Sequence, residues 1–171
     1  MFFENTGGSK NGQTTNERGG GGGINDEAMK LYYMREFRDQ LIQFLDELIE
    51  QFPLEGEFVL IRIFLKDQVA MTDVIGRFMR DLLPLKGLVA ERNEKFFLEN
   101  TFLYMGDSGL MATDFMKDRV NHFKRLWVSD QLSDEDRKIM WKWMDLFMQI
   151  AELYFHKFGH IQGWEPKPKV K

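Results

Sequence analysis

A chain of 171 residues can form one compact domain with its own hydrophobic core, and it is short for two independent domains. A net charge of −4 and a pI near 5.5 argue against general binding to nucleic acid, which needs clustered Lys and Arg to displace counterions from phosphates. Without cysteine the chain has no disulfide framework and no thiolate metal site, and its 16 Phe, 11 Met and 4 Trp need burial somewhere.

The first residues carry no secretory signal. MFFENTGGSK has neither the basic region nor the apolar stretch of a signal peptide. Elsewhere, no uncharged apolar window is long enough for a membrane-spanning helix. We therefore expect a soluble protein that is neither secreted nor transmembrane.

Residues 1–23 are predicted to be a flexible Gly-rich arm. Eight of the 15 glycines precede Ile24, among Asn, Thr, Ser and Gln, so this segment cannot bury enough apolar area to offset its ordering entropy. Only Phe2 and Phe3, at the tip, are candidates for protein interaction. The alternative is a solvated tail that binds nothing.

Residues 24–163 are predicted to be a helical domain. Apolar residues recur at three- and four-residue steps from Met34 until Pro53 ends the first helix. The apolar run FVLIRIFL at 58–65 is ambiguous alone, but its continuation predicts one helix over 58–83. Its polar residues form a single line, comprising Arg62, Lys66, Asp73, Arg77 and Arg80.

The second half is predicted to hold two more principal helices. Residues 85–109 are harder to interpret, with one or two helical turns followed by a loop. A helix over about 110–127 follows, capped by Asp107 or Ser108. Ser133 begins the final helix and Gly159 ends it. The fold class is therefore all-α, an irregular bundle of about four main helices with no sheet.

The final helix is apolar around nearly its whole circumference. Between Ile139 and Phe155, thirteen of seventeen residues are apolar, and the polar ones form one narrow strip. Because the helix over 58–83 has the same character, we expect apolar surface to remain for a partner protein. The alternative is that both helices form the middle of a thick bundle. The candidate interaction residues in the final helix are Trp141, Trp143, Phe147 and Phe155.

The sequence offers no evident catalytic apparatus. Glu152, His156 and His160 could share a helix face and ligate a divalent metal, but Gly159 is expected to end the helix between the two histidines. We therefore favour a capping and solvent-facing role for them, near a helix C-terminus that stabilises cationic His. The glycine run lacks the Gly-Lys-Ser/Thr of a phosphate-binding loop, and no GxSxG occurs. We predict no enzyme activity, small-molecule substrate, cofactor or metal.

The C-terminal segment, WEPKPKVK at 164–171, is predicted to be an extended Pro/Lys tail. Such a tail is suited to lying along a groove of an acidic partner. A solvated, disordered tail is the alternative.

Two stretches support a family resemblance. RNEKFFLEN (92–100) and FKRLWVSDQLSDEDRKIMWKWMDLFMQIAELY (123–154) combine an Arg-Asn and Phe-Phe-Leu-Glu-Asn box with a Leu-Trp box that leads into the Trp-rich helix. The second half of the chain thereby resembles short helical proteins of nucleocytoplasmic large DNA viruses, including those of algae and amoebae. The resemblance implies a minor capsid or other virion component, without catalytic residues.

Together these observations predict a structural protein of a virus particle. It would bridge neighbouring capsid proteins, or copies of itself, through apolar helices and a flexible arm that orders on assembly in the host cytoplasm. One alternative is an adaptor with a helix-in-groove surface formed by Trp141, Trp143 and Phe147. The other is a metal-dependent enzyme centred on Glu152, His156 and His160.

Overall fold

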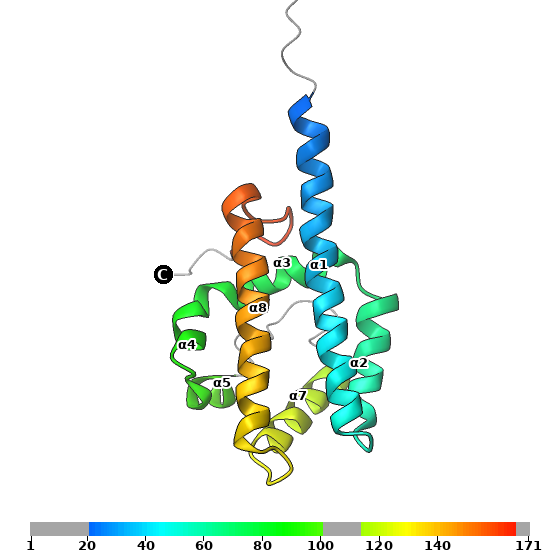
Figure 1. The fold of residues 1–171 in the computed structure, drawn as a ribbon, viewed down its shortest axis with the longest axis vertical. Helices are drawn as coiled ribbons and strands as arrows, with labels where there is room; N and C mark the ends of the chain where they lie inside the picture. The colour runs from blue at the N-terminus through cyan, green and yellow to red at the C-terminus, as the bar shows by residue number, and fades with distance from the viewer. Residues whose placement is uncertain (1–20, 101–113, 167–171) are drawn as a thin grey trace, which may run out of the picture.

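The computed structural model describes residues 21–100 and 114–166, and these residues are all-helical, without a strand among them (Figure 1). The expected fold class is therefore confirmed at the level of an all-α chain. Phe2 and Phe3, the arm up to residue 20, and the capping residues proposed at 107 and 108 lie outside the described residues.

The described elements are more numerous than expected, so the division into about four main helices is not confirmed. Helix α1 already begins within the glycine run. In chain order the elements are α1 (Gly21–Gln51), α2 (Gly56–Asp67), α3 (Met71–Asp81), the 3-10 helix η1 (Leu83–Leu85), α4 (Lys86–Ala90), α5 (Glu94–Glu99), α7 (Asp114–Trp127) and α8 (Asp134–Phe158).

The prediction of one helix over 58–83 was wrong, because the chain breaks between α2 and α3. The amide of Gln68 closes the last turn of α2 on the carbonyl of Phe64, and Ala70 is extended, with φ −64° and ψ 142°. The break directs the two helices into different parts of the core. Phe58 and Leu65 of α2 join one buried cluster, whereas the buried residues of α3 join another.

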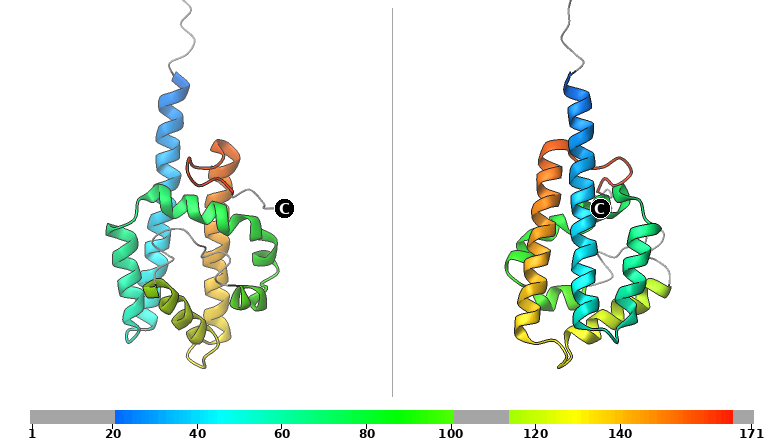
Figure 2. Two further views of the ribbon diagram at one scale, coloured as in Figure 1. Left: turned by 180° about the vertical axis from the view of Figure 1, so that it is seen from behind. Right: turned by 45° about the vertical axis from the view of Figure 1, so that its right-hand side comes forward.

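Helices α1 and α8 run antiparallel and side by side through the length of the molecule (Figures 1 and 2). Helix α2 packs on α1 at the periphery, α3 crosses both long helices, and α7 crosses the end at which α8 begins. The two long helices therefore form the central pair, as the nearly all-apolar character of α8 indicated.

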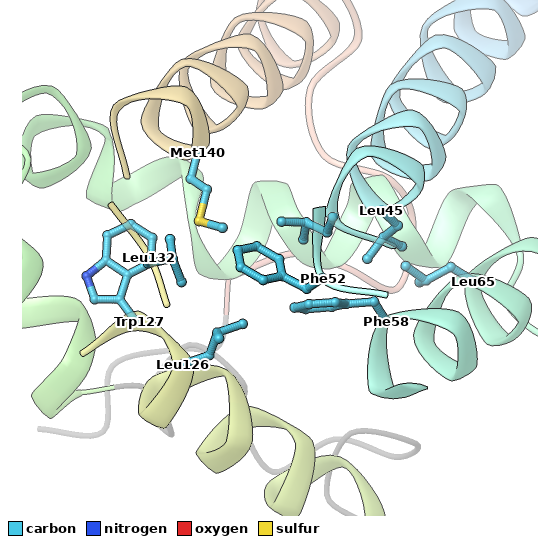
Figure 3. Close-up of a cluster of buried hydrophobic side chains, with 9 residues drawn as sticks. Leu45, Phe52, Phe58, Leu65, Leu126, Trp127, Leu132 and Met140 are labelled. Atoms are coloured by element: carbon cyan, nitrogen blue, oxygen red, sulfur yellow. The ribbon is translucent and has the colours of Figure 1, made fainter. Parts of the chain in front are cut away.

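The first core cluster lies at the end where α8 begins (Figure 3). Phe52 is at its centre, with Met140, Leu126 and Phe58 turned toward it. The cluster thus joins α1, α2, α7 and α8. Its buried members are Leu45, Leu48, Phe52, Phe58, Leu65, Leu126, Trp127, Leu132 and Met140.

The second core cluster joins α1, α3 and α8. Phe37 is 1% exposed and lies 5.0 Å from Phe78 and 5.6 Å from Phe147, measured between ring centroids. Burial raises the pKa of the Tyr154 hydroxyl at the edge of this cluster. The buried members are Phe37, Ile75, Met79, Phe147, Ile150, Ala151 and Tyr154.

Both predicted ends of the final helix are confirmed. Ser133 is the N-cap of α8, and its hydroxyl accepts from the amide of Asp136 at 3.2 Å, while the Asp136 carboxylate accepts from the amide of Ser133 at 2.8 Å. Hydrogen bonds from Ser133 lower the pKa of Asp136. Gly159 ends the helix with φ +74°, a conformation that favours glycine.

Candidate interaction surfaces

Trp141 is half-buried and packs against other residues of the same chain. Its ring packs 5.9 Å from Phe97 and 6.0 Å from Trp127, between centroids. The indole N–H donates to Glu94 Oε1 at 3.5 Å. Trp141 therefore joins α8 to α5 and to the end of α7.

Trp143 and Phe147 lie on a different side of α8 from Trp141, because two residues along a helix turn through about 200°. Trp143 stacks on Phe147 at 5.9 Å and donates its indole N–H to Glu47 of α1 at 2.9 Å. Phe147 is only 4% exposed. The three side chains therefore do not form one exposed surface of the kind that a helix-in-groove adaptor would present.

Phe155, the fourth candidate in α8, packs partly buried against the second core cluster. Its ring lies 4.8 Å from the ring of His160. All four candidates in α8 thus make internal contacts, and a role for any of them in binding a partner stays a prediction.

The two motif boxes meet around Trp141. Arg92 forms a bidentate ion pair with Asp145 of α8, with Nη1–Oδ1 and Nη2–Oδ2 distances of 2.6 and 2.5 Å, and its guanidinium lies 5.4 Å from the Trp141 ring. Asn93 caps α5 by accepting from the amide of Phe96 at 3.0 Å. These residues of the first box hold α5 against the Trp-rich helix.

The second box contains Trp127, whose ring packs on Trp141. The guanidinium of Arg137 donates to the carbonyl of Trp127 at 2.9 and 3.2 Å, which fixes the turn between α7 and α8. The contacts of Arg92, Asn93 and Arg137 therefore maintain the fold.

Glu152 and His156 come together, but His160 does not join them. Glu152 Oε1 lies 3.4 Å from His156 Nε2 and also pairs with Lys86 of α4. The Lys86 ammonium, followed by His156, lowers the pKa of Glu152. Among residues 21–100 and 114–166, no group of three or more His, Cys, Asp or Glu side chains is placed to hold a metal ion.

Helix α2 presents an apolar surface to solvent. Val59, Leu60 and Ile63 are 39%, 45% and 47% exposed, and Leu54, just before the helix, is 96% exposed. We call these four residues the outer α2 surface. Helix α2 lies at the edge of the molecule (Figures 1 and 2).

A second exposed apolar region lies on the first turns of α1. This part of the helix extends beyond the rest of the molecule (Figures 1 and 2). Ile24 is 80% exposed, Leu31 40% and Tyr32 57%. Exposed apolar side chains are thus grouped on α1 and α2 rather than at the tryptophans of α8, and the expectation that apolar surface serves a partner stays a prediction.

Trp164, expected to begin an extended tail, instead packs on α3. Its indole N–H donates to Asp73 Oδ1 at 3.0 Å, and the Arg80 guanidinium lies 4.8 Å from its ring. The ring covers Gly76, where a Cβ would lie 2.7 Å from Trp164 Cγ. The glycine in the middle of α3 was the one sequence signal for this contact. Residues 167–171 lie outside the described residues.

No family model, no curated protein and no solved structure matches this chain. In the part of the chain that the structure describes, no helix has both the length and the apolar character needed to cross a membrane.

Proposed function

We propose that this chain is a non-catalytic structural component of a large DNA virus particle, a minor capsid protein that bridges or cements neighbouring capsid components. Its location would be the virion, assembled in the host cytoplasm. Its partners would be proteins, with no small-molecule substrate and no cofactor. The proposal joins the resemblance of residues 92–100 and 123–154 to virion proteins with the exposed apolar side chains of the surface.

The observation that carries the proposal is the apolar surface on two separate helices. A monomer that functions alone gains nothing from exposing Leu60 and Ile63 on one helix and Ile24 and Tyr32 on another, because contiguous exposed apolar groups favour association. Two surfaces at different places on one molecule suit a bridging role, since each can contact a different neighbour.

The internal tryptophans support a rigid bridge. Trp141 ties α8 to α5 and α7, Trp143 ties it to α1, and Trp164 ties the end of the described chain to α3. A rigid body binds neighbours without a large ordering cost. In the proposal the Gly-rich arm, with Phe2 and Phe3, adds a tether that orders only on assembly.

The proposal is tested by mass spectrometry of purified virus particles from a culture that expresses the chain. We expect the chain in the particle at a fixed ratio to the major capsid protein, retained after salt washing. Its absence from purified particles, together with recovery of one host protein by the recombinant chain, would favour the adaptor and overturn the proposal.

A further inference from the structure

The C-terminal strap, which we define as residues 159–166, turns back from the end of α8 to α3 (Figure 2). Gly159 and Gly163 have φ of +74° and +86°, which allows the chain to reverse its direction. Among the described residues, the only backbone hydrogen bond from the strap to a helix is the one at its own start, where the amide of Gly159 donates to the carbonyl of Phe155. Beyond that point, side chains alone hold the strap on the rest of the protein.

Helix α3 presents three residues that match three parts of an indole. Asp73, Gly76 and Arg80 share one face of the helix, because they are three and four residues apart. Asp73 Oδ1 accepts from the Trp164 indole N–H at 3.0 Å, and the Arg80 guanidinium lies 4.8 Å from the ring centroid. An added Cβ at Gly76 would lie 2.7 Å from Cδ1 and Cγ of Trp164, so the missing side chain is what lets the ring approach. We call these three residues the α3 indole site.

The shape of the α3 indole site is set by α3 itself. The Arg80 guanidinium is held by the neighbouring Asp81, with Nε–Oδ1 and Nη2–Oδ2 distances of 2.6 and 2.7 Å. Asp73 and Gly76 belong to the same helix, whose backbone fixes the spacing of the three residues. Because a site on one rigid helix needs no rearrangement to bind, we expect it to persist when the Trp164 ring is removed.

We propose that the α3 indole site is a recognition site for a tryptophan side chain, that Trp164 is its intramolecular ligand, and that the strap opens from it while the helices stay folded. Segments with few buried contacts open at a lower free energy than the core. Apart from Trp164, the strap contacts the protein through Ile161, which packs on the second core cluster, and through His160, which packs on Phe155. Its other residues are exposed: Gln162, Gly163, Glu165 and Pro166.

The inference does not rest on the proposed function, because it concerns a contact within one chain. It names a binding site and the chemical group that the site takes, whatever particle or complex contains the protein. A tryptophan from another chain, or free indole, could enter the site only while the strap is open.

The test removes the intramolecular ligand and supplies its chemical group from solution. Free indole is titrated into the full-length Trp164→Ala variant by calorimetry, and its effect on the thermal unfolding of the variant is measured. We expect the variant to keep the helical circular dichroism of the native chain and to bind indole with a dissociation constant on the order of millimolar. The native chain should bind indole at least about tenfold more weakly, because Trp164 occupies the site.

Two controls test the glycine and the hydrogen bond separately. In Gly76→Ala/Trp164→Ala the added Cβ takes the place of the ring, so indole should bind at least about tenfold more weakly than to Trp164→Ala. Gly87→Ala/Trp164→Ala is the matched variant and should bind as Trp164→Ala does, because nothing lies within 4 Å of its added Cβ. The ligand 1-methylindole lacks the N–H that Asp73 accepts, so Trp164→Ala should bind it at least about threefold more weakly than indole.

Four outcomes would contradict the strap or the site. Loss of the helical circular dichroism in Trp164→Ala would show that the strap is part of the cooperative core and would overturn its separate opening. Absence of indole binding to folded Trp164→Ala up to about 10 mM, or equal binding by Gly76→Ala/Trp164→Ala, would overturn the recognition site. Equal binding of 1-methylindole would overturn the role of Asp73. Indole binding that requires both Gly76 and the ligand N–H supports the site, whether or not the chain is found in virus particles.

Discussion

At the scale of single residues, two backbone positions explain how the helices are held together. Arg92 is the only described non-glycine residue with positive φ, at +54°, and it pairs with Asp145 of α8. Gly76 leaves room for the ring of Trp164. Positive φ at Arg92 and the missing side chain at Gly76 each permit a contact with a residue that is distant in sequence.

Substitutions at Arg92 separate the effect of backbone strain on stability from the effect of the ion pair with Asp145. Arg92→Ala and Arg92→Gly both remove the pair with Asp145, but only Gly accepts positive φ without cost. We expect Arg92→Gly to be more stable than Arg92→Ala by about 1 kcal/mol in urea unfolding. Asp145→Ala is the control that removes the ion pair alone. Equal stability of the two Arg92 variants would contradict a strained position.

Gly76 allows a test of the Trp164 contact. A Cβ at residue 76 must displace the Trp164 ring, so Gly76→Ala should destabilise the chain in urea unfolding and increase the quenching of its tryptophan fluorescence by acrylamide. Gly87→Ala is the matched control, because nothing lies within 4 Å of its added Cβ. Better helix propensity should make that control about 0.5 kcal/mol more stable. A stabilising effect at both positions would contradict the contact.

At the scale of elements, local sequence explains the ends of α8 but not the break between α2 and α3. Ser133 and Asp136 form a reciprocal cap, and Gly159 stops the helix, so both ends are specified by neighbouring residues. No Gly or Pro marks the break after Asp67. Instead, it follows from the separate clusters that α2 and α3 enter.

The cap of α8 predicts a pH dependence. The pKa of Asp136 is lowered in the folded chain, so its contribution to stability is present above the ordinary value of 3.8 and is lost as the pH falls through the folded pKa. The stability difference between the native chain and Asp136→Asn should therefore be largest near neutral pH and vanish in strong acid. Thermal unfolding from pH 2 to 7 measures it. Glu135→Gln, in the same turn but outside the reciprocal cap, should show a smaller change, and equal changes would count against the cap.

At the scale of the whole molecule, α1 and α8 form a central pair, and the uncovered apolar groups lie at the periphery. The two core clusters are arranged along this pair, one toward each end. The apolar surface of α8 is largely covered because α1, α3, α5 and α7 all contact this helix. Among the described residues, exposed large apolar side chains are grouped on α2 and on the first turns of α1.

This arrangement predicts that Phe147 acts on stability rather than on binding. Phe147 is 4% exposed between α1 and α3, so Phe147→Ala should cost about 3–5 kcal/mol in chemical unfolding. Leu153→Ala, at an exposed position of the same helix, should change stability by less than about 0.5 kcal/mol. A small effect of Phe147→Ala would contradict its place in the core.

The sequence by itself determined the all-helical class and both ends of α8. These properties depend on periodicity, caps and composition, which are local or additive. Only the tertiary structure decided where α2 ends, that Trp164 covers Gly76, and that Val59, Leu60 and Ile63 rather than Trp141 and Trp143 face solvent. Which side of an apolar helix is covered depends on contacts between segments distant in the chain, and these contacts leave no periodic signal in either segment.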